Sequence, residues 1–107
     1  MYIKIKNKKI KILEYTKKTD RIKSLKFVLE PIDYGIKIPK KKLVNTYFFC
    51  QKVDVCITNK ENIIIKMYES LKSEKRKFHW KSYNIYYLPL GTVKNMKIGD
   101  TLIPKEK

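Results

Sequence analysis

The sequence predicts a mainly β fold, a small antiparallel β-sandwich or barrel-like domain of about six or seven short strands with one short helix near the N-terminus. Three observations predict it. Apolar and charged residues alternate near the N-terminus, aromatic and β-branched residues gather in short runs, and polar or glycine- and proline-containing turns separate the runs. A chain of 107 residues can form one modest core, so we expect a single domain over residues 1–107.

The N-terminal residues are predicted to form a hairpin. Isoleucine alternates with lysine over residues 3–6 and again over residues 9–12, which is a strand pattern. Asn7 and Lys8 interrupt the pattern and suggest the turn. The second strand should continue to Tyr15.

A short helix is expected after the hairpin. Thr16 or Thr19 can serve as its N-cap, and apolar residues recur at helical spacing up to Phe27. Residues 29–42 contain two prolines and a glycine and should form a loop with a short strand. The lysines at residues 40–42 should lie in an exposed turn.

The densest apolar stretch lies in the middle of the chain. Residues 43–50 and 53–58 are rich in aromatic and β-branched residues, as strands are. Residues 59–62 form a polar turn and residues 63–68 resume the strand pattern. We therefore expect a hairpin that begins at residue 53.

The C-terminal part should alternate between loops and short elements. Residues 70–81 are polar and basic and are predicted to form a long loop, while residues 83–88 should form a strand that ends at Pro89. Residues 91–100 have room for one helical turn and a glycine-centred tight turn. A last short strand is expected at residues 101–103.

The formal net charge of +16 is typical of proteins that bind phosphates. However, 24 of the 26 basic residues are lysine, alanine is absent, and the charges are spread along the whole chain. AT-rich codons produce the same bias. The charge by itself therefore indicates only weak, salt-sensitive attraction to nucleic acid, an acidic protein or an anionic membrane surface.

No apolar run approaches the roughly 18 residues that span a bilayer, and the N-terminus lacks the core of a signal peptide. We expect a cytoplasmic protein that is a monomer or a weak homo-oligomer. Cys50 and Cys56 are the only cysteines, and no histidine or cysteine lies near them at zinc-like spacing. Two reduced, largely buried thiols, no metal site and no cofactor are therefore expected.

Four segments of the chain carry short motifs. They are Asp-Arg-Ile-Lys-Ser-Leu at residues 20–25, Gly-Ile-Lys-Ile at 35–38, an aromatic strand pair with Val-Asp-Val at 46–57, and Leu-Pro-Leu-Gly followed by Ile-Gly-Asp at 88–100. Together they resemble the family called domain of unknown function 192. This chain has Ser24 where glycine is usual in that family. The resemblance implies a small sandwich-type β domain with the early helix packed on one side, and it implies no activity or catalytic residue.

Asp54 interrupts the apolar strand, and alternation places it with Cys56 on one face. A buried carboxylate needs a hydrogen-bonded or charged partner. Where lysine replaces arginine almost everywhere, the retained Arg21 indicates that its planar guanidinium group is required. We predict a structural Arg21–Asp54 ion pair rather than a catalytic role for Asp54.

The strongest functional signal lies in residues 72–81. The chain's only histidine and only tryptophan lie there among cations, and nucleic acids bind where bases stack on rings and cations hold phosphates. The candidate nucleic-acid contacts are Lys72, Lys75, Arg76, Lys77, His79, Trp80 and Lys81. The favoured alternative is a loop in which Phe78 and Trp80 fold back onto the core while the cations face water.

Three functions remain open from the sequence. The leading one is a non-enzymatic β domain that binds a protein partner or a small ligand through Tyr47, Trp80 and Tyr83. The second is a nucleic-acid-binding module. The third is an enzyme, but a single histidine without a recognisable nucleophile identifies no catalytic residue. An enzyme would have to bring His79, Asp54 or Asp100 into one pocket with shifted pKa values.

Overall fold

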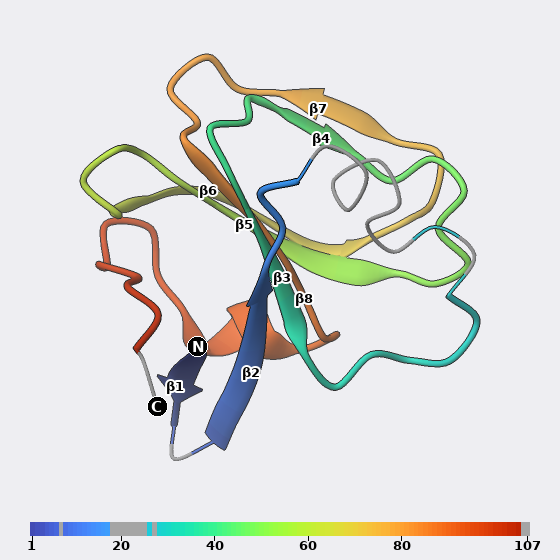
Figure 1. Ribbon diagram of the computed structural model, residues 1–107, viewed down its shortest axis with the longest axis horizontal. Coiled ribbons are helices and arrows are strands. Elements are labelled where there is room, and N and C mark those ends of the chain that lie inside the picture. Colours follow the sequence, from blue (N-terminus) through green and yellow to red (C-terminus); the bar gives the residue numbers. More distant parts are fainter. Residues whose placement is uncertain (7, 18–25, 27, 106–107) are drawn as a thin grey trace.

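The computed structural model describes residues 1–6, 8–17, 26 and 28–105. This part of the chain contains eight strands and one 3₁₀ turn (Figure 1). The elements are β1 (Tyr2–Ile5), β2 (Lys8–Glu14), β3 (Gly35–Pro39), β4 (Leu43–Asn45), β5 (Val53–Thr58), β6 (Ile64–Leu71), β7 (Arg76–Phe78), β8 (Asn84–Leu88) and η1 (Thr92–Asn95). The prediction of a mainly β fold is confirmed.

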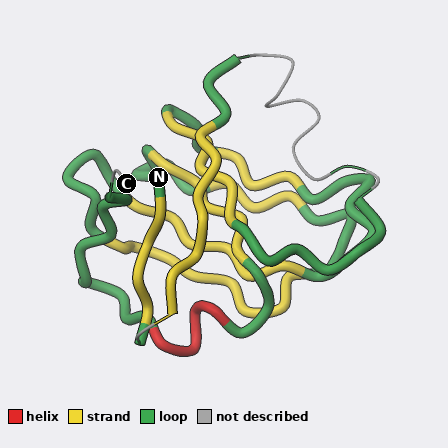
Figure 2. Tube along the Cα trace, turned by 60° about the horizontal axis from the view of Figure 1, so that its bottom comes forward, coloured by secondary structure: helices red, strands yellow, loops and turns green. Residues whose placement is uncertain are grey.

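Six of the strands form one sheet with the order β1-β2-β3-β8-β5-β6, and β4 pairs with β7 in a separate ribbon. The sheet curls into a half-barrel, with the ribbon at its upper end in Figure 1. In Figure 2 the η1 turn, drawn in red, lies at the lower edge of the strands.

The N-terminal hairpin is present, with β1 and β2 antiparallel and Ile3 opposite Ile10. The expectation of an antiparallel sheet holds only in part, because β2 and β3 are parallel, with Ile12 opposite Gly35. Parallel neighbours require a long connection, which residues 15–34 provide. The sequence showed the strands but not the direction in which they pair.

The predicted helix near the N-terminus lies mostly outside the described residues. Lys26, which is described, forms an isolated bridge with Phe49 instead of a helical turn. Of the residues that the structure describes, only Thr92–Asn95 are helical, where one turn was expected. No helix in the described ranges is long and apolar enough to cross a membrane.

The central hairpin of β5 and β6 is confirmed, with its turn at residues 59–62. Two other predictions are wrong. The strand expected over residues 43–50 ends at Asn45, and Phe48 then adopts a φ of 67°, which breaks an extended strand. The loop expected over residues 70–81 contains the end of β6 and all of β7, because β4 offers β7 a partner that is distant in sequence.

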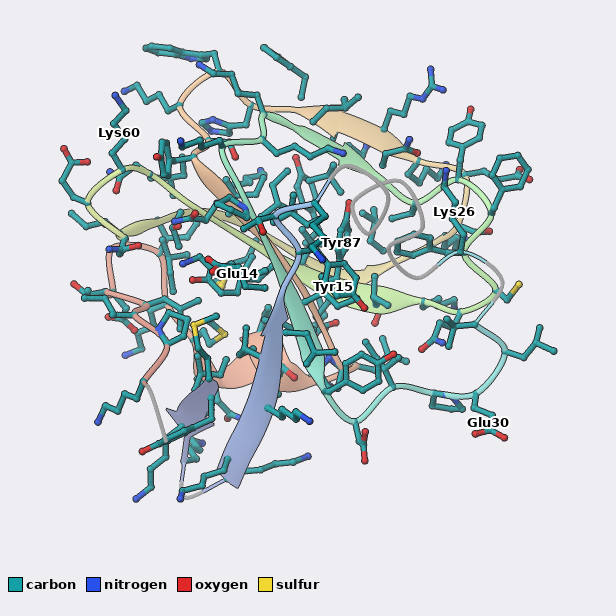
Figure 3. All side chains as sticks on the ribbon, in the orientation of Figure 1. Glu14, Tyr15, Lys26, Glu30, Lys60 and Tyr87 are labelled. Carbon is teal, nitrogen blue, oxygen red and sulfur yellow. The ribbon has the colours of Figure 1, made fainter. Side chains whose placement is uncertain are left out.

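Apolar side chains cover both faces of the sheet. Val55, Ile57 and Tyr87 lie in one cluster, together with Val44 from the ribbon, and Figure 3 shows Tyr87 near the centre of the molecule. Cys56, Tyr86 and Leu88 lie in a second cluster that η1 and Leu102 help to cover. Every residue of β5 and β8 is buried for this reason.

The two ends of the described chain meet. The backbone N–H of Tyr2 donates to Lys105 O at 2.9 Å, and the N–H of Lys105 donates to Tyr2 O at 2.8 Å. The strand expected at residues 101–103 is only a single bridge between Thr101 and Ile63. The C-terminal segment therefore lies against the β1 edge without forming a further strand.

Candidate functional site

Asp54 is fully buried, and backbone groups satisfy its carboxylate. Oδ1 accepts the N–H of Ser70 at 2.9 Å, and Oδ2 accepts the N–H of Val93 at 3.0 Å. The side chain thus joins β5 to the end of β6 and to η1. Arg21 lies outside the described residues, so the Arg21–Asp54 ion pair stays a prediction.

The three candidate residues for an enzyme site, His79, Asp54 and Asp100, do not lie in one pocket. Asp100 lines a cleft of 470 Å³ between β1 and the C-terminal segment, whereas His79 lines a hollow of 510 Å³ beside Trp80. Asp54 has no exposed surface. Within the described ranges, no group of three or more His, Cys, Asp or Glu side chains could hold a metal ion.

The β4–β7 ribbon turns its aromatic residues outward. Val44 lies opposite Lys77 and is buried, so alternation turns the neighbouring Phe78 to the outer face. Phe78 is 68% exposed and Trp80 is 66% exposed. The favoured alternative from the sequence, in which both rings fold back onto the core, is wrong.

Thr46 anchors the loop that leads into the ribbon. Its buried hydroxyl donates to Lys72 O at 2.8 Å and accepts the N–H of Lys75 at 2.9 Å. At the adjacent Asn45, the backbone N–H donates to the hydroxyl of Tyr87, which donates to Asn45 O. Burial raises the pKa of Tyr87 to about 12, while the hydrogen bond that the Asn45 N–H donates to the phenol oxygen opposes that rise.

A groove of 610 Å³ opens beside Trp80. Its lining has four lysines, two aromatic residues and one carboxylate, together with Asn59 and Ser82; these seven are Lys40, Lys42, Lys60, Lys81, Trp80, Tyr83 and Glu61. The groove brings together residues from three parts of the chain. They are the turn before β4, the β5–β6 turn and the segment after β7.

Ser82 and Tyr83 form what we call the floor of this groove. Hydrogen bonds join this floor to the turn before β4 and to the end of β5. The Ser82 hydroxyl donates to Lys41 O at 2.7 Å, and the Lys41 N–H donates to Tyr83 O at 3.1 Å. On the other side, the Tyr83 N–H donates to Thr58 O at 2.8 Å. These backbone and side-chain hydrogen bonds fix the positions of Ser82 and Tyr83.

The β5–β6 turn places Lys60 over the groove. The Asn59 side chain accepts the N–H groups of Glu61 and Ile63, both at 3.0 Å, which stabilises the turn. Lys60 Nζ lies 6.0 Å from the centroid of the Tyr83 ring. Figure 3 shows the Lys60 side chain pointing outward from this turn.

Two more lysines contact Trp80 directly. Lys81 Nζ lies 4.9 Å from the centroid of the indole ring, and Lys42 Nζ donates to Trp80 O at 2.7 Å. Trp80 and Lys81 also line the second hollow, whose other walls include Ile63, Ile65 and Ile98. Trp80 thus borders both a groove lined by lysines and a hollow whose walls include isoleucine side chains.

The structure separates the candidate residues of the 72–81 segment. Arg76, Trp80 and Lys81 are exposed on the outer surface, whereas Lys77 lies on the inner face of the ribbon opposite Val44. Lys72 and Lys75 lie at the other end of the ribbon, beside Thr46. Of the aromatic candidates, Tyr83 lines the groove and Tyr47 stacks with Arg76 at 4.7 Å.

Sequence reasoning missed three groove lysines. Lys40 and Lys42 belong to the run that was expected to be an exposed turn, and Lys60 belongs to a hairpin turn. No local pattern marked them as neighbours of Trp80, because the pairing of β4 with β7 and of β5 with β8 brings them there.

Comparison with known proteins shows the fold. No family model and no curated protein matches the chain. A protein of unknown function from Novosphingobium aromaticivorans DSM 12444 superposes with a TM-score of 0.77 at 11% identity, over 94% of this chain and 80% of that one. A "putative transcription regulator" from Sinorhizobium meliloti 1021 superposes with a TM-score of 0.79 at 13% identity, over 96% and 90% of the two chains. Such low identity leaves the function open, and the resemblance to domain of unknown function 192 stays a prediction.

Proposed function

We propose that this domain is a non-enzymatic module that binds nucleic acid, with an exposed base stacked on Trp80 and phosphates held by the surrounding lysines. The groove beside Trp80 carries the proposal, because it combines two aromatic rings with four lysines on a hydrogen-bonded floor. Base stacking on an aromatic ring is worth about 1–3 kcal/mol per base. An exposed tryptophan flanked by cations is suited to this mode of binding.

The charge distribution favours nucleic acid over the protein or small-molecule ligand that led the sequence hypotheses. Lys81 lies over the Trp80 ring and Lys60 over the Tyr83 ring, so each ring carries a cation next to it. An anionic backbone can contact these cations while its bases reach the rings. An acidic protein could satisfy the charges, but it would need an aromatic or arginine side chain of its own to stack on the indole ring.

Three further considerations fit this function. One solved structure with the same fold is described as a "putative transcription regulator", which is a nucleic-acid-related role. A cytoplasmic location, as the sequence predicts, would give the domain access to nucleic acid. The net charge of +16 would speed the encounter with such a polyanion.

Intrinsic fluorescence tests the proposal, because Trp80 is the only tryptophan. Titration with an oligothymidine should quench its emission, and the affinity should fall as salt rises. Each phosphate contact with a single strand contributes about −0.7 to the slope of log K against log salt. The double substitution Lys60→Gln and Lys81→Gln should therefore make the slope less negative by about 1.4.

The matched control removes the same charge elsewhere. Lys8→Gln and Lys11→Gln change two exposed lysines on β2, at the opposite end of the molecule from the ribbon (Figure 1). This pair should leave the salt slope nearly unchanged. The proposal is wrong if both double variants shift the slope equally, if no oligonucleotide quenches Trp80, or if polyglutamate quenches it as strongly as the oligothymidine.

A further inference from the structure

The outer face of the β4–β7 ribbon continues the exposed surface away from Trp80. Leu43 lies opposite Phe78 and Asn45 opposite Arg76, and alternation places these four side chains on the face away from Val44. Beyond Asn45, the Tyr47 ring stacks with the Arg76 guanidinium group. Exposed rings thus occur at Trp80, at Phe78 and at Tyr47.

The spacing of this face suits unstacked bases. Arg76 and Phe78 are two residues apart on one strand, which corresponds to roughly 6.7 Å. A stacked strand of nucleic acid rises only about 3.4 Å per nucleotide. A base on Phe78 and a base on the stacked Arg76–Tyr47 pair would therefore be separated from one another, as splayed single-stranded bases are. A duplex keeps its bases paired and stacked.

Cations accompany the rings along the ribbon. Lys42 and Lys81 contact Trp80 at one end, and Arg76 contacts Tyr47 at the other. Lys72 and Lys75 are exposed near that second end, in the loop that Thr46 anchors. A phosphate backbone that follows the ribbon would meet positive charge at both ends.

We infer that the outer face of the ribbon is a track for single-stranded nucleic acid that runs from Trp80 past Phe78 to Tyr47. This inference rests on the proposed function and specifies its ligand. Three rings provide places for about three bases, one on each ring. The track therefore binds a short single strand and discriminates against a duplex.

A length series tests the track. Thymidine monophosphate and oligothymidines of two to eight nucleotides should bind with affinities that rise to about three nucleotides and then level off. Phe78→Leu and Tyr47→Leu should each weaken binding of the octamer by at least about fivefold, the lower end of the range for one lost stack. Both variants should leave the quenching of Trp80 by the monophosphate unchanged, because that ligand needs only the Trp80 end.

Tyr2→Leu is the matched control. Lys9 lies over the Tyr2 ring at 4.7 Å, just as Arg76 lies over the Tyr47 ring, but Tyr2 is on β1 and outside the track. This variant should bind the octamer like the wild type. If Phe78→Leu and Tyr47→Leu bind the octamer like the wild type while Trp80 is still quenched, the track is wrong and the proposed function stands. Equal affinity for a blunt duplex also overturns the track. If no oligonucleotide quenches Trp80, the proposed function fails and the track fails with it.

Discussion

Asp54 shows how one buried residue organises the chain around it. Its two carboxylate oxygens accept N–H groups from residues 16 and 39 positions further along the chain. Ser70 donates one of these bonds from a left-handed conformation, with a φ of 54°, at the point where β6 approaches its end. The carboxylate therefore stabilises a bend from which the chain continues towards the ribbon.

Asp54→Asn should destabilise the protein. The amide keeps one acceptor oxygen but presents an NH₂ group to the second backbone N–H, so one charged hydrogen bond is lost in a fully buried site. The free energy of unfolding should fall by about 1.5–3 kcal/mol. Urea denaturation measures this loss, and Asp100→Asn, at an exposed position, should change stability by less than about 0.5 kcal/mol.

The same assay tests the predicted ion pair. If Arg21 contacts Asp54, then Arg21→Gln should also destabilise, and the double variant should lose less stability than the two single variants together. If the stability losses of the two single variants are strictly additive, Arg21 does not interact with Asp54, and the backbone N–H groups of Ser70 and Val93 are the partners that stabilise the carboxylate.

The sequence could predict that Asp54 needs partners but could not identify them. A carboxylate in an apolar strand requires hydrogen bonds on physical grounds. Both observed donors are backbone groups, which every residue but proline carries, so residue type gives no signal. Only the bend at Ser70 and the position of η1 bring these two backbone donors within hydrogen-bonding distance of the Asp54 carboxylate.

At the scale of elements, local chemistry decided which strands could be predicted. The β5–β6 hairpin has an apolar strand on each side of a turn that Asn59 stabilises, so its local sequence is sufficient to predict it. The ribbon strand β7 has the sequence Arg-Lys-Phe and exposes two of its three side chains. It has no apolar alternation to reveal it, and it is a strand because β4 pairs with it.

Gly35 is required where β3 lies between β2 and β8. A Cβ atom there would lie 2.7 Å from Ile12 Cδ1 and 2.8 Å from Leu88 Cδ2, in the buried core. Gly35→Ala should therefore lower the free energy of unfolding by about 1–3 kcal/mol. Because Ile12→Val removes the closest atom, the double variant should be more stable than the sum of the single effects predicts. Additive losses in urea denaturation would contradict this contact.

At the scale of the whole molecule, burial of both sheet faces places ionisable groups in the core. Tyr86, Tyr87 and Cys56 lie on β8 and β5 and are almost fully buried. Burial raises the pKa of the Cys56 thiol to about 12. It also raises the pKa of Tyr86, with smaller contributions from Cys56 and Glu14. The folded state therefore favours the neutral forms of these groups.

Alkaline pH should destabilise the protein for this reason. Below pH 10 the Tyr87 phenol is protonated in the folded and unfolded states, so it does not affect the pH dependence of stability. Between pH 10 and about 12 the unfolded chain loses this proton while the folded protein keeps it, and the free energy of unfolding falls. Tyr87 should account for about 1–3 kcal/mol of this fall in the free energy of unfolding by pH 12. Urea denaturation at several pH values measures the fall, and Tyr87→Phe should reduce it; an equal fall in that variant would contradict the assignment.

The hydrogen bonds between Tyr2 and Lys105 have a kinetic consequence. They close a loop that contains nearly the entire chain, so they can form only at a high cost in chain entropy and should form after the central hairpin. Small β proteins with such distant pairings fold in roughly milliseconds to seconds. Once folded, the same pair should open first, and hydrogen exchange at the Tyr2 and Lys105 amides should be faster than in β5 and β8. The contact between Tyr2 and Lys105 should thus be the last to form on folding and the first to open on unfolding.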